Sequence, residues 1–341
     1  MLSRSKFNPK LLQTQYYPEL SQSYPAHPQP QYNPAESAIP EQERDMADAM
    51  RTKLTQYTPG SLLALANTHG FQRVSIQLFG FYGHGKSSLI NLCVSVLRNQ
   101  PYQNFAGSGW SDGSVIRERR DFPLTNTVCI TDNRGFISLD QGEITEASAQ
   151  LRGLRLVDES VNWDRNMEEK LEFLVQRCHT PPTDFVLPLI VYRGTMNLTT
   201  EQSDHMKNFI VRSFAVTGVF PIVVLIESGE SQEKISNNFH MLGASYVFAL
   251  QKFQMEQPER DNETDVEILN ILTACLDEAD RGIKKRQRLG REVEFRRQVQ
   301  EQIMVELELE REKVRQRVRE EIKQEQDKTS VTPTIVSLAT D

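Results

Sequence analysis

The segment from Val74 to Leu89 reads VSIQLFGFYGHGKSSL and decides the fold. It begins with apolar residues at alternate positions, Val74, Ile76 and Leu78, which is typical of a β-strand. The pattern GxxxxGKS follows between positions 80 and 87, and the apolar residues after it recur at a spacing that predicts an amphipathic helix. A glycine loop between a strand and a helix predicts a phosphate-binding loop.

The residue types in this loop suit the chemistry of a nucleotide. Its glycines allow a tight turn whose backbone N–H groups point inward, and the positive end of the following helix also attracts anions. Lys86 would supply a positive charge to the outer phosphates, the Ser87 hydroxyl would bind Mg²⁺, and Ser88 would cap the helix and reach the inner phosphates. The predicted nucleotide-binding residues of the loop are Gly80, Gly83, His84, Gly85, Lys86, Ser87 and Ser88. The alternative is an ordinary glycine-rich turn before a helix.

A second candidate motif follows a short apolar strand at 127–132, which ends in Asp132 and continues as DNRG to Gly135. An aspartate at the end of a strand beside the loop would hold Mg²⁺, directly or through water. The N–H group of Gly135 would sense the terminal phosphate. The predicted metal ligands are therefore Ser87 and Asp132, and the predicted cofactors are Mg²⁺ and a nucleotide, with the base left open. The alternative is a plain turn after a core strand.

Apolar runs and amphipathic stretches alternate along the rest of the central region. Expected strands lie at 115–122, 185–192, 219–226 and 245–250, and expected helices at 43–57, 61–66, 142–176, 200–214, 231–242 and 265–279. This alternation predicts an α/β fold, a P-loop NTPase-type mostly parallel sheet with helices on both faces, followed by a long charged C-terminal helix. Ligands of such sheets bind beyond the carboxyl ends of the strands, which suits both motifs.

The composition divides the chain into four parts. Residues 1–42 form a head rich in Pro, Gln and Tyr that we expect to be disordered, and its PxxP at 25–28 would either bind a partner with an aromatic groove or belong to a plain linker. Residues 43–282 form the predicted P-loop GTPase-like domain. Residues 283–328 form a charged helix whose apolar stripe has 11-residue steps, and 329–341 form a disordered tail. The charged helix is either a coiled-coil arm that makes a homodimer or binds a protein partner, or a single solvated helix.

The bulk properties exclude several classes of protein. A net charge of −7 over 341 residues argues against a general nucleic-acid binder. The four cysteines are scattered, which favours reduced thiols in the cytosol over a disulfide framework or a zinc site. The first residues show no secretory signal, and no apolar run approaches the ~20 residues of a membrane span. We therefore expect a cytoplasmic protein.

Three stretches carry a resemblance to a known family. The phosphate loop and DNRG resemble a translation-factor-type GTPase domain. More narrowly, LFGFYGHGKSSLINL at 78–92, the strand into 132–135, and DVEILNILTACLDEADRGI at 265–283 resemble the interferon-induced microtubular-aggregate protein family of vertebrate GTPase-like proteins. The resemblance covers about residues 62–283. It implies a cytoplasmic protein that binds a guanine nucleotide, GTP or GDP, and is linked to interferon and innate immunity.

Three features depart from an active GTPase. The segment at 226–230 lacks the lysine and aspartate of the [NT]KxD motif that reads guanine, and no threonine lies between Ser87 and Thr125 to close over the metal. Phe136 stands where many GTPases place a side chain that orients water. We therefore expect Mg²⁺-dependent binding of GTP with slow or absent hydrolysis. The alternatives are a catalytic NTPase without strict base preference, and a scaffold that binds no nucleotide and acts through its helical arm.

Overall fold

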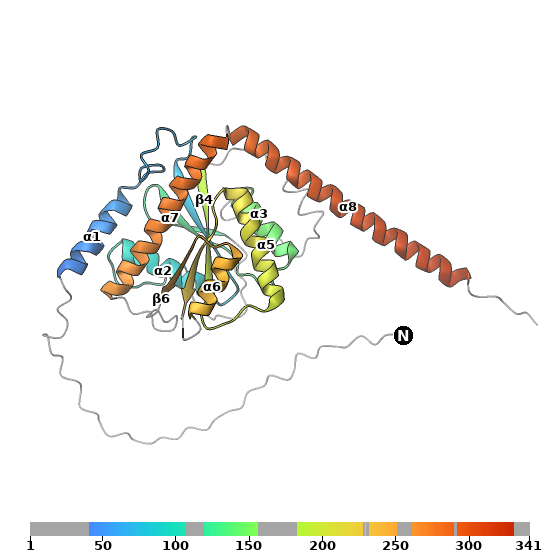
Figure 1. Cartoon of the computed structure of the whole chain (residues 1–341), viewed down its shortest axis with the longest axis horizontal. Helices are drawn as coiled ribbons and strands as arrows, with labels where there is room; N and C mark the ends of the chain where they lie inside the picture. The colour runs from blue at the N-terminus through green and yellow to red at the C-terminus, as the bar shows by residue number, and fades with distance from the viewer. Residues whose placement is uncertain are drawn as a thin grey trace, which may run out of the picture. The chain divides into compact units, whose positions relative to one another are not determined.

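The computed structural model describes residues 41–106, 119–155, 183–227, 229, 232–250, 261–289 and 292–330. Helices and strands alternate through these ranges (Figure 1). They are α1 (Glu41–Thr55), β1 (Arg73–Phe79), α2 (Lys86–Leu97), β2 (Arg120–Pro123), β3 (Val128–Asp132), α3 (Gln141–Leu151), β4 (Asp184–Arg193), α5 (Thr200–Thr217), β5 (Ile222–Ile226), α6 (Gln232–Leu242), β6 (Tyr246–Leu250), α7 (Asn262–Leu289) and α8 (Glu292–Ser330).

Some predictions fall outside the described residues. They include the PxxP segment, the head before residue 41, the second half of the expected helix at 142–176, and the tail after residue 330. α1 begins at residue 41 and α8 ends at residue 330, so each helix extends two residues into a segment that was expected to be disordered. In the described part of the chain, no helix combines the length and the apolar character that a membrane span requires.

The described strands form one six-stranded sheet in the order β2-β3-β1-β4-β5-β6. β2 pairs antiparallel with β3, and all the other neighbours are parallel. The apolar runs that the sequence offered as strands form β4 and β5, and both are buried along nearly their whole length. This sheet confirms the predicted α/β class with a mostly parallel sheet. The apolar runs had indicated it, because strands of continuous apolar character need cover on both faces.

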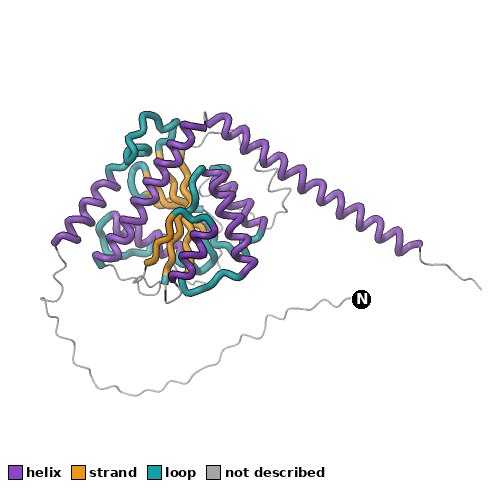
Figure 2. The backbone as a smooth tube through the Cα atoms, in the orientation of Figure 1, coloured by secondary structure: helices purple, strands orange, loops and turns teal. Residues whose placement is uncertain are grey.

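Helices pack against both faces of the sheet, as Figure 2 shows for the central strands. One core cluster joins β1 residues such as Ile76 and Leu78 to α1, α2 and α7. The other joins Phe79 to α3, α5 and α6. The sheet is therefore the middle of three layers.

The position of β1 in the sheet determines where a ligand can bind. β3 lies on one side of β1 and β4 on the other, so the chain crosses to opposite sides after leaving this strand. A crevice forms beyond the carboxyl end of a strand at such a switch point. The glycine loop from Gly80 to Gly85 begins at that end of β1.

Two local predictions were wrong. The expected helix at 61–66 is a series of turns at 59–64, because Asp280 on α7 accepts hydrogen bonds from the N–H groups of Gly60, Leu62 and Leu63. These bonds anchor the turns to α7. The charged helix does not start at residue 283, because α7 continues through the predicted domain boundary to Leu289 and buries Ile283.

Candidate functional site

The three loop glycines adopt backbone conformations that other residues rarely adopt. Gly80, Gly83 and Gly85 have φ angles of 145°, 75° and 82°. At Gly80 a Cβ atom would lie only 2.1 Å from the carbonyl oxygen of Val191, so β4 leaves no room for a side chain. The pattern of glycines is therefore required by the shape of the loop and by its contact with β4.

Helix α2 starts without a side-chain cap, contrary to the role predicted for Ser88. Its N-cap residue is Gly85, and the described residues supply no side-chain hydrogen bond to that position. Ser88 lies buried inside the first turn, because the left-handed backbone of Gly85 starts the helix three residues earlier. The first turn also carries no acidic residue, so no carboxylate of that turn offsets the positive end of α2.

Lys86 is enclosed by the loop that precedes it. Its Nζ donates hydrogen bonds to the carbonyl oxygens of Gly80 (3.2 Å) and Phe81 (3.0 Å), and the residue is only 7% exposed. Burial lowers the pKa of Lys86 to about 8, and the nearby carboxylate of Asp132 opposes this shift. A cation held in this way is available to an anion that enters the loop.

Ser87 and Asp132 come together as the sequence predicted. The Ser87 hydroxyl donates a hydrogen bond of 2.9 Å to Oδ2 of Asp132. Asp132 is 3% exposed, and its second oxygen, Oδ1, is buried without a hydrogen-bond partner among the described residues. Burial raises the pKa of Asp132, whereas Lys86 and Ser87 counteract the rise. The Ser87 hydroxyl and the Asp132 carboxylate, one oxygen of which is unsatisfied, are the kind of oxygen ligands that Mg²⁺ prefers.

The segment after Asp132 is joined to the loop by main-chain hydrogen bonds. The N–H of Phe136 donates to Gly80 O (2.9 Å), and the N–H of Tyr82 donates to Phe136 O (2.8 Å). Gly135 packs so closely that a Cβ atom there would lie 2.7 Å from Nζ of Lys86. Gly135 therefore lies beside the loop as predicted, and the Tyr82 side chain is 63% exposed.

Phe136 belongs to the hydrophobic core beneath the loop. It is buried, and its ring lies 6.1 Å from that of Phe79 and 5.4 Å from that of Phe209. The position after DNRG therefore presents an apolar ring to the protein interior.

The His84 side chain is engaged with the end of β4. Its Nδ1 accepts a hydrogen bond of 3.2 Å from the N–H of Arg193, and its ring lies 4.9 Å from that of Tyr192. Burial, helped by the charges of Lys86 and Arg193, lowers the pKa of His84 to about 4. The neutral imidazole thus positions the loop against β4, a role that the sequence did not indicate. Arg193 itself is held by an ion pair of 2.5 Å with Glu227 after β5.

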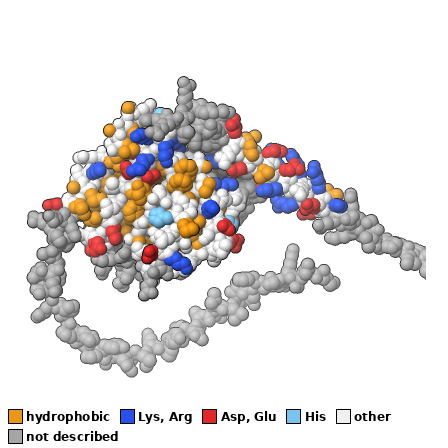
Figure 3. Space-filling model, in the orientation of Figure 1, with side chains coloured by type: hydrophobic (Ala, Val, Ile, Leu, Met, Phe, Trp, Pro, Cys, Tyr) orange, Lys and Arg blue, Asp and Glu red, His pale blue; other side chains and the backbone are white. Residues whose placement is uncertain are grey.

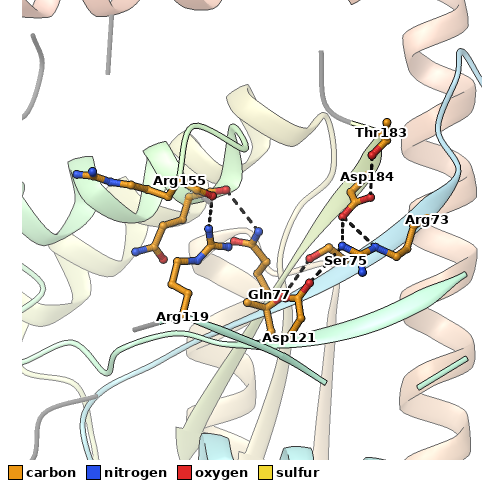
Figure 4. A network of polar contacts seen from close by, with 10 residues as sticks. Arg73, Ser75, Gln77, Arg119, Asp121, Arg155, Thr183 and Asp184 are labelled. Carbon is orange, nitrogen blue, oxygen red and sulfur yellow. Dashed lines mark hydrogen bonds and ion pairs between the residues drawn. The ribbon is translucent and has the colours of Figure 1, made fainter. Parts of the chain in front are cut away.

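Sequence reasoning missed a buried polar network behind Asp132. The side chain of Asn133 donates to Leu78 O (3.2 Å) and accepts from Nε of Arg119 (2.9 Å). Arg119 also donates to the carbonyl oxygen of Arg155 (2.6 Å), and Figure 4 shows these two arginines side by side. Arg155 forms a buried ion pair of 2.7 Å with Glu146 on α3. The network ties the end of β3 to β1 and α3. Partners so far apart in the chain leave no local pattern in the sequence.

A second polar group lies at the amino end of β1, away from the loop. Arg73 forms ion pairs with Asp184 (2.6 Å) and Asp121 (3.2 Å), and Figure 4 shows its guanidinium beside both carboxylates. Asp121 accepts a further hydrogen bond of 2.6 Å from Thr131. These contacts join β2, β3, β1 and β4, so they serve the sheet.

Glu143 fixes the turn that follows DNRG. Its carboxylate accepts hydrogen bonds from the N–H groups of Ile137 (3.0 Å), Ser138 (3.1 Å) and Leu139 (2.6 Å). Asp140 caps α3 by accepting a hydrogen bond of 2.9 Å from the N–H of Glu143. The segment from Asp132 to α3 is thus held at both ends.

Comparisons with known proteins assign no family to this chain. No protein-family model matches it, and no curated protein matches it. A crystal structure of a mutation variant of SsGBP is similar with a TM-score of 0.30 and 14% sequence identity, over 70% of this chain and 66% of that chain. A TM-score this low does not establish a shared fold. The fold and the site define an α/β protein with a mostly parallel sheet and a glycine loop at its switch point.

Proposed function

We propose that this chain is a GTPase-like protein that binds a Mg²⁺–nucleotide complex, with GTP as the nucleotide, in the loop from Gly80 to Ser88. The observation that carries the proposal is the Ser87–Asp132 hydrogen bond beside the buried Lys86, together with the unsatisfied Oδ1 of Asp132. An unpartnered carboxylate oxygen at a buried site is costly unless a ligand satisfies it. A divalent cation would do so.

Each residue of the site has a defined task in this proposal. Lys86 exchanges its two carbonyl partners for phosphate oxygens, and the uncapped N–H groups at the start of α2 donate to the inner phosphates. Ser87 and Asp132 hold Mg²⁺, which neutralises phosphate charge when it is bound. Gly135 leaves the space that Lys86 needs.

The proposal includes slow or absent hydrolysis. Hydrolysis of a nucleoside triphosphate requires a group that orients the attacking water. At the position after DNRG, where many GTPases place such a group, this chain has Phe136, which is buried against Phe79 and Phe209. The main-chain bonds between Phe136 and the loop oppose a movement that would exchange this ring for another group.

The guanine base, the cytoplasmic location and the link to interferon-dependent innate immunity rest on the resemblance of segments 78–92, 132–135 and 265–283 to the family named above. Glu227 lies in the segment 226–230, where a GTPase would read the guanine base, and its carboxylate is held by an ion pair with Arg193. This residue therefore gives no separate support for guanine. The choice of base is therefore the first property to measure.

A panel of thermal denaturation measurements tests the proposal. The melting temperature would be compared with GTP, GDP, ATP and no nucleotide, each with Mg²⁺ and with EDTA. We expect GTP and GDP with Mg²⁺ to raise the melting temperature of the wild type and of Lys207→Ala, an exposed lysine on α5, but not that of Lys86→Ala.

The other outcomes identify the alternatives. Equal shifts with ATP and GTP, together with turnover well above background, would indicate a catalytic NTPase without strict base preference. The absence of a shift with every nucleotide would overturn nucleotide binding and leave a scaffold that acts through its helical arm.

A further inference from the structure

One apolar face of α8 changes its environment along the helix. Ile303 and Leu307 are buried, whereas Val314, Val318 and Ile322 are 37%, 47% and 50% exposed. Ile303 and Val314 lie 11 residues apart, as do Leu307 and Val318, and about 11 residues make three helical turns. These side chains therefore lie on the same face, which is covered near its start and uncovered further along.

The covered part of this face contacts the α/β domain. Gln302 accepts a hydrogen bond of 3.2 Å from Arg152 after α3, and Glu306 forms an ion pair of 3.7 Å with Arg212 on α5. Both contacts are polar and lie at the rim of the buried pair Ile303 and Leu307. Beyond Leu307 the apolar side chains of this face are open to solvent, as the exposed fractions of Val314, Val318 and Ile322 show.

The charges of α8 are arranged in two consecutive blocks. Residues 306–312, the acidic block, contain four glutamates and one arginine. Residues 313–319, the basic block, contain one lysine, three arginines and no acidic residue. Figure 3 shows acidic and basic side chains crowded along this helix with apolar ones between them.

Within one helix the basic block pairs with the acidic block through exposed ion pairs. Arg315 pairs with Glu308 (3.2 Å) and Arg317 with Glu310 (3.5 Å), and both arginines are more than half exposed. Ion pairs at such exposed positions contribute about 0–1 kcal/mol each. They can therefore be exchanged for equivalent pairs with another helix at little cost.

From these observations we infer that α8 pairs in antiparallel orientation with α8 of a second copy of this chain. Antiparallel pairing places the acidic block of one copy against the basic block of the other. The same register brings Leu307 opposite Val318 of the partner subunit and Ile303 opposite Ile322 of the partner subunit. Parallel pairing in register would place like charges against each other, which is unfavourable.

Pairing in this register competes with the contact between α8 and its own domain. Ile303 and Leu307 cannot stay buried in their place beside the Arg152–Gln302 and Arg212–Glu306 contacts and pack against a second helix at the same time. Formation of the dimer therefore releases the Arg152–Gln302 and Arg212–Glu306 contacts. The helix exchanges between a docked state in the monomer and a paired state in the dimer.

Sedimentation velocity of the full chain, from about 1 to about 100 µM, tests the pairing. We expect a monomer–dimer equilibrium for the wild type. Val314→Glu with Val318→Glu should weaken the dimer at least ~100-fold, because two charges would enter the apolar face. Val305→Glu with Leu309→Glu is the matched control, since these exposed residues lie on the opposite face of α8, and it should dimerise like the wild type. Circular dichroism would establish that both variants keep their helices.

Charge exchange tests the partner and the orientation. A chain with Lys313, Arg315, Arg317 and Arg319 changed to Glu, and a chain with Glu306, Glu308, Glu310 and Glu312 changed to Lys, should each be monomeric alone and form a dimer when mixed. Leu307→Cys in one chain and Val318→Cys in another should form a mixed disulfide on oxidation, because the antiparallel register places these two positions opposite each other.

Three results would overturn the inference. They are a wild type that remains monomeric at 100 µM, a control variant that loses the dimer as completely as Val314→Glu with Val318→Glu, and disulfides that join only like positions. None of these measurements requires a nucleotide, so their outcome is independent of the proposed function.

Discussion

The hydroxyl of Ser87, in the first turn of α2, donates a hydrogen bond of 2.9 Å to Asp132 at the end of β3. The two residues are 45 positions apart in the chain, and the parallel pairing of β1 with β3 brings them together. Their oxygens are the ones that a divalent cation would bind beside Lys86. The first prediction therefore concerns this pair.

Asp132→Asn should weaken Mg²⁺-dependent nucleotide binding by roughly tenfold or more, which corresponds to about 1.4 kcal/mol. The amide keeps the shape of the side chain but removes the charge that holds the cation. Burial of the carboxylate raises its pKa, which means that the folded protein disfavours the charged form of Asp132. The neutral Asn should therefore leave the nucleotide-free protein no less stable than the wild type. Titration of a fluorescent nucleotide with Mg²⁺ and with EDTA measures the effect. Asp121→Asn, on β2, is the control, and an affinity for Mg²⁺–nucleotide equal to that of the wild type in Asp132→Asn would exclude Asp132 as a ligand.

Gly80→Ala should lower the free energy of unfolding by about 3 kcal/mol or more. The new Cβ would lie 2.1 Å from the carbonyl oxygen of Val191, and backbone atoms of β4 cannot yield without disturbing the sheet. Gly83→Ala is the matched control. Its φ of 75° is unfavourable for alanine, but no described atom lies within 4 Å of the new Cβ, so the cost should be about 1 kcal/mol. Urea unfolding compares the two variants, and equal losses would refute the role assigned to β4.

The stability of the native protein should fall as the pH decreases from about 6.5 to 4, in part because of His84. Its pKa is lowered to about 4 in the folded protein, against about 6.5 in an unfolded chain. In this interval the unfolded state binds a proton that the native state does not, so the free energy of unfolding decreases as the pH falls. The contribution is on the order of 3 kcal/mol.

Urea unfolding of the wild type and of His84→Asn between pH 7 and pH 4 isolates this contribution. The Oδ1 atom of Asn can accept the hydrogen bond from the N–H of Arg193, so the contact with β4 is kept without a titrating ring. The variant should lose less stability than the wild type over this interval. Parallel pH profiles of the two proteins would show that His84 does not titrate differently on unfolding.

Asp280→Asn should cost about 2–4 kcal/mol of stability without affecting nucleotide affinity. The fully buried carboxylate accepts hydrogen bonds from the Tyr57 hydroxyl (2.7 Å), Gly60 N (2.7 Å) and Leu62 N (2.9 Å), and an amide group cannot accept all of them. Tyr57→Phe removes one of these bonds and should cost about 1 kcal/mol. Thermal denaturation and nucleotide titration measure the two effects. A loss of affinity without a loss of stability would assign Asp280 to the site instead of the scaffold.

The strands and the loop were accessible from the sequence because local spacing specifies them. The alternation at Val74, Ile76 and Leu78, followed by GxxxxGKS, predicted β1, the loop and α2 in the correct order. The apolar runs predicted β4 and β5 because strands covered on both faces need them. The residues beside Lys86 were also anticipated, since the parallel arrangement brings the carboxyl ends of β1 and β3 together.

The errors concern residues whose role was assigned from their type alone. The segment at 61–66 has the composition of a short helix, but Asp280 captures its N–H groups and holds it in turns. Ser88 has the right residue type for a helix cap, but the backbone at Gly85 starts α2 earlier. Only the distant contact with Asp280 lies beyond the reach of a local pattern.

The sequence by itself determined the order of strands and helices, the glycine loop and the candidate ligands Lys86, Ser87 and Asp132, because short-range periodicity and residue type specify them. Only the tertiary structure decided that His84 contacts β4, that Phe136 is bonded to the loop, and that Glu146 and Arg155 support the end of β3. These contacts join segments that are far apart in the chain. They form only when packing of the helices against the sheet brings those segments together, and no motif in the sequence marks them in advance.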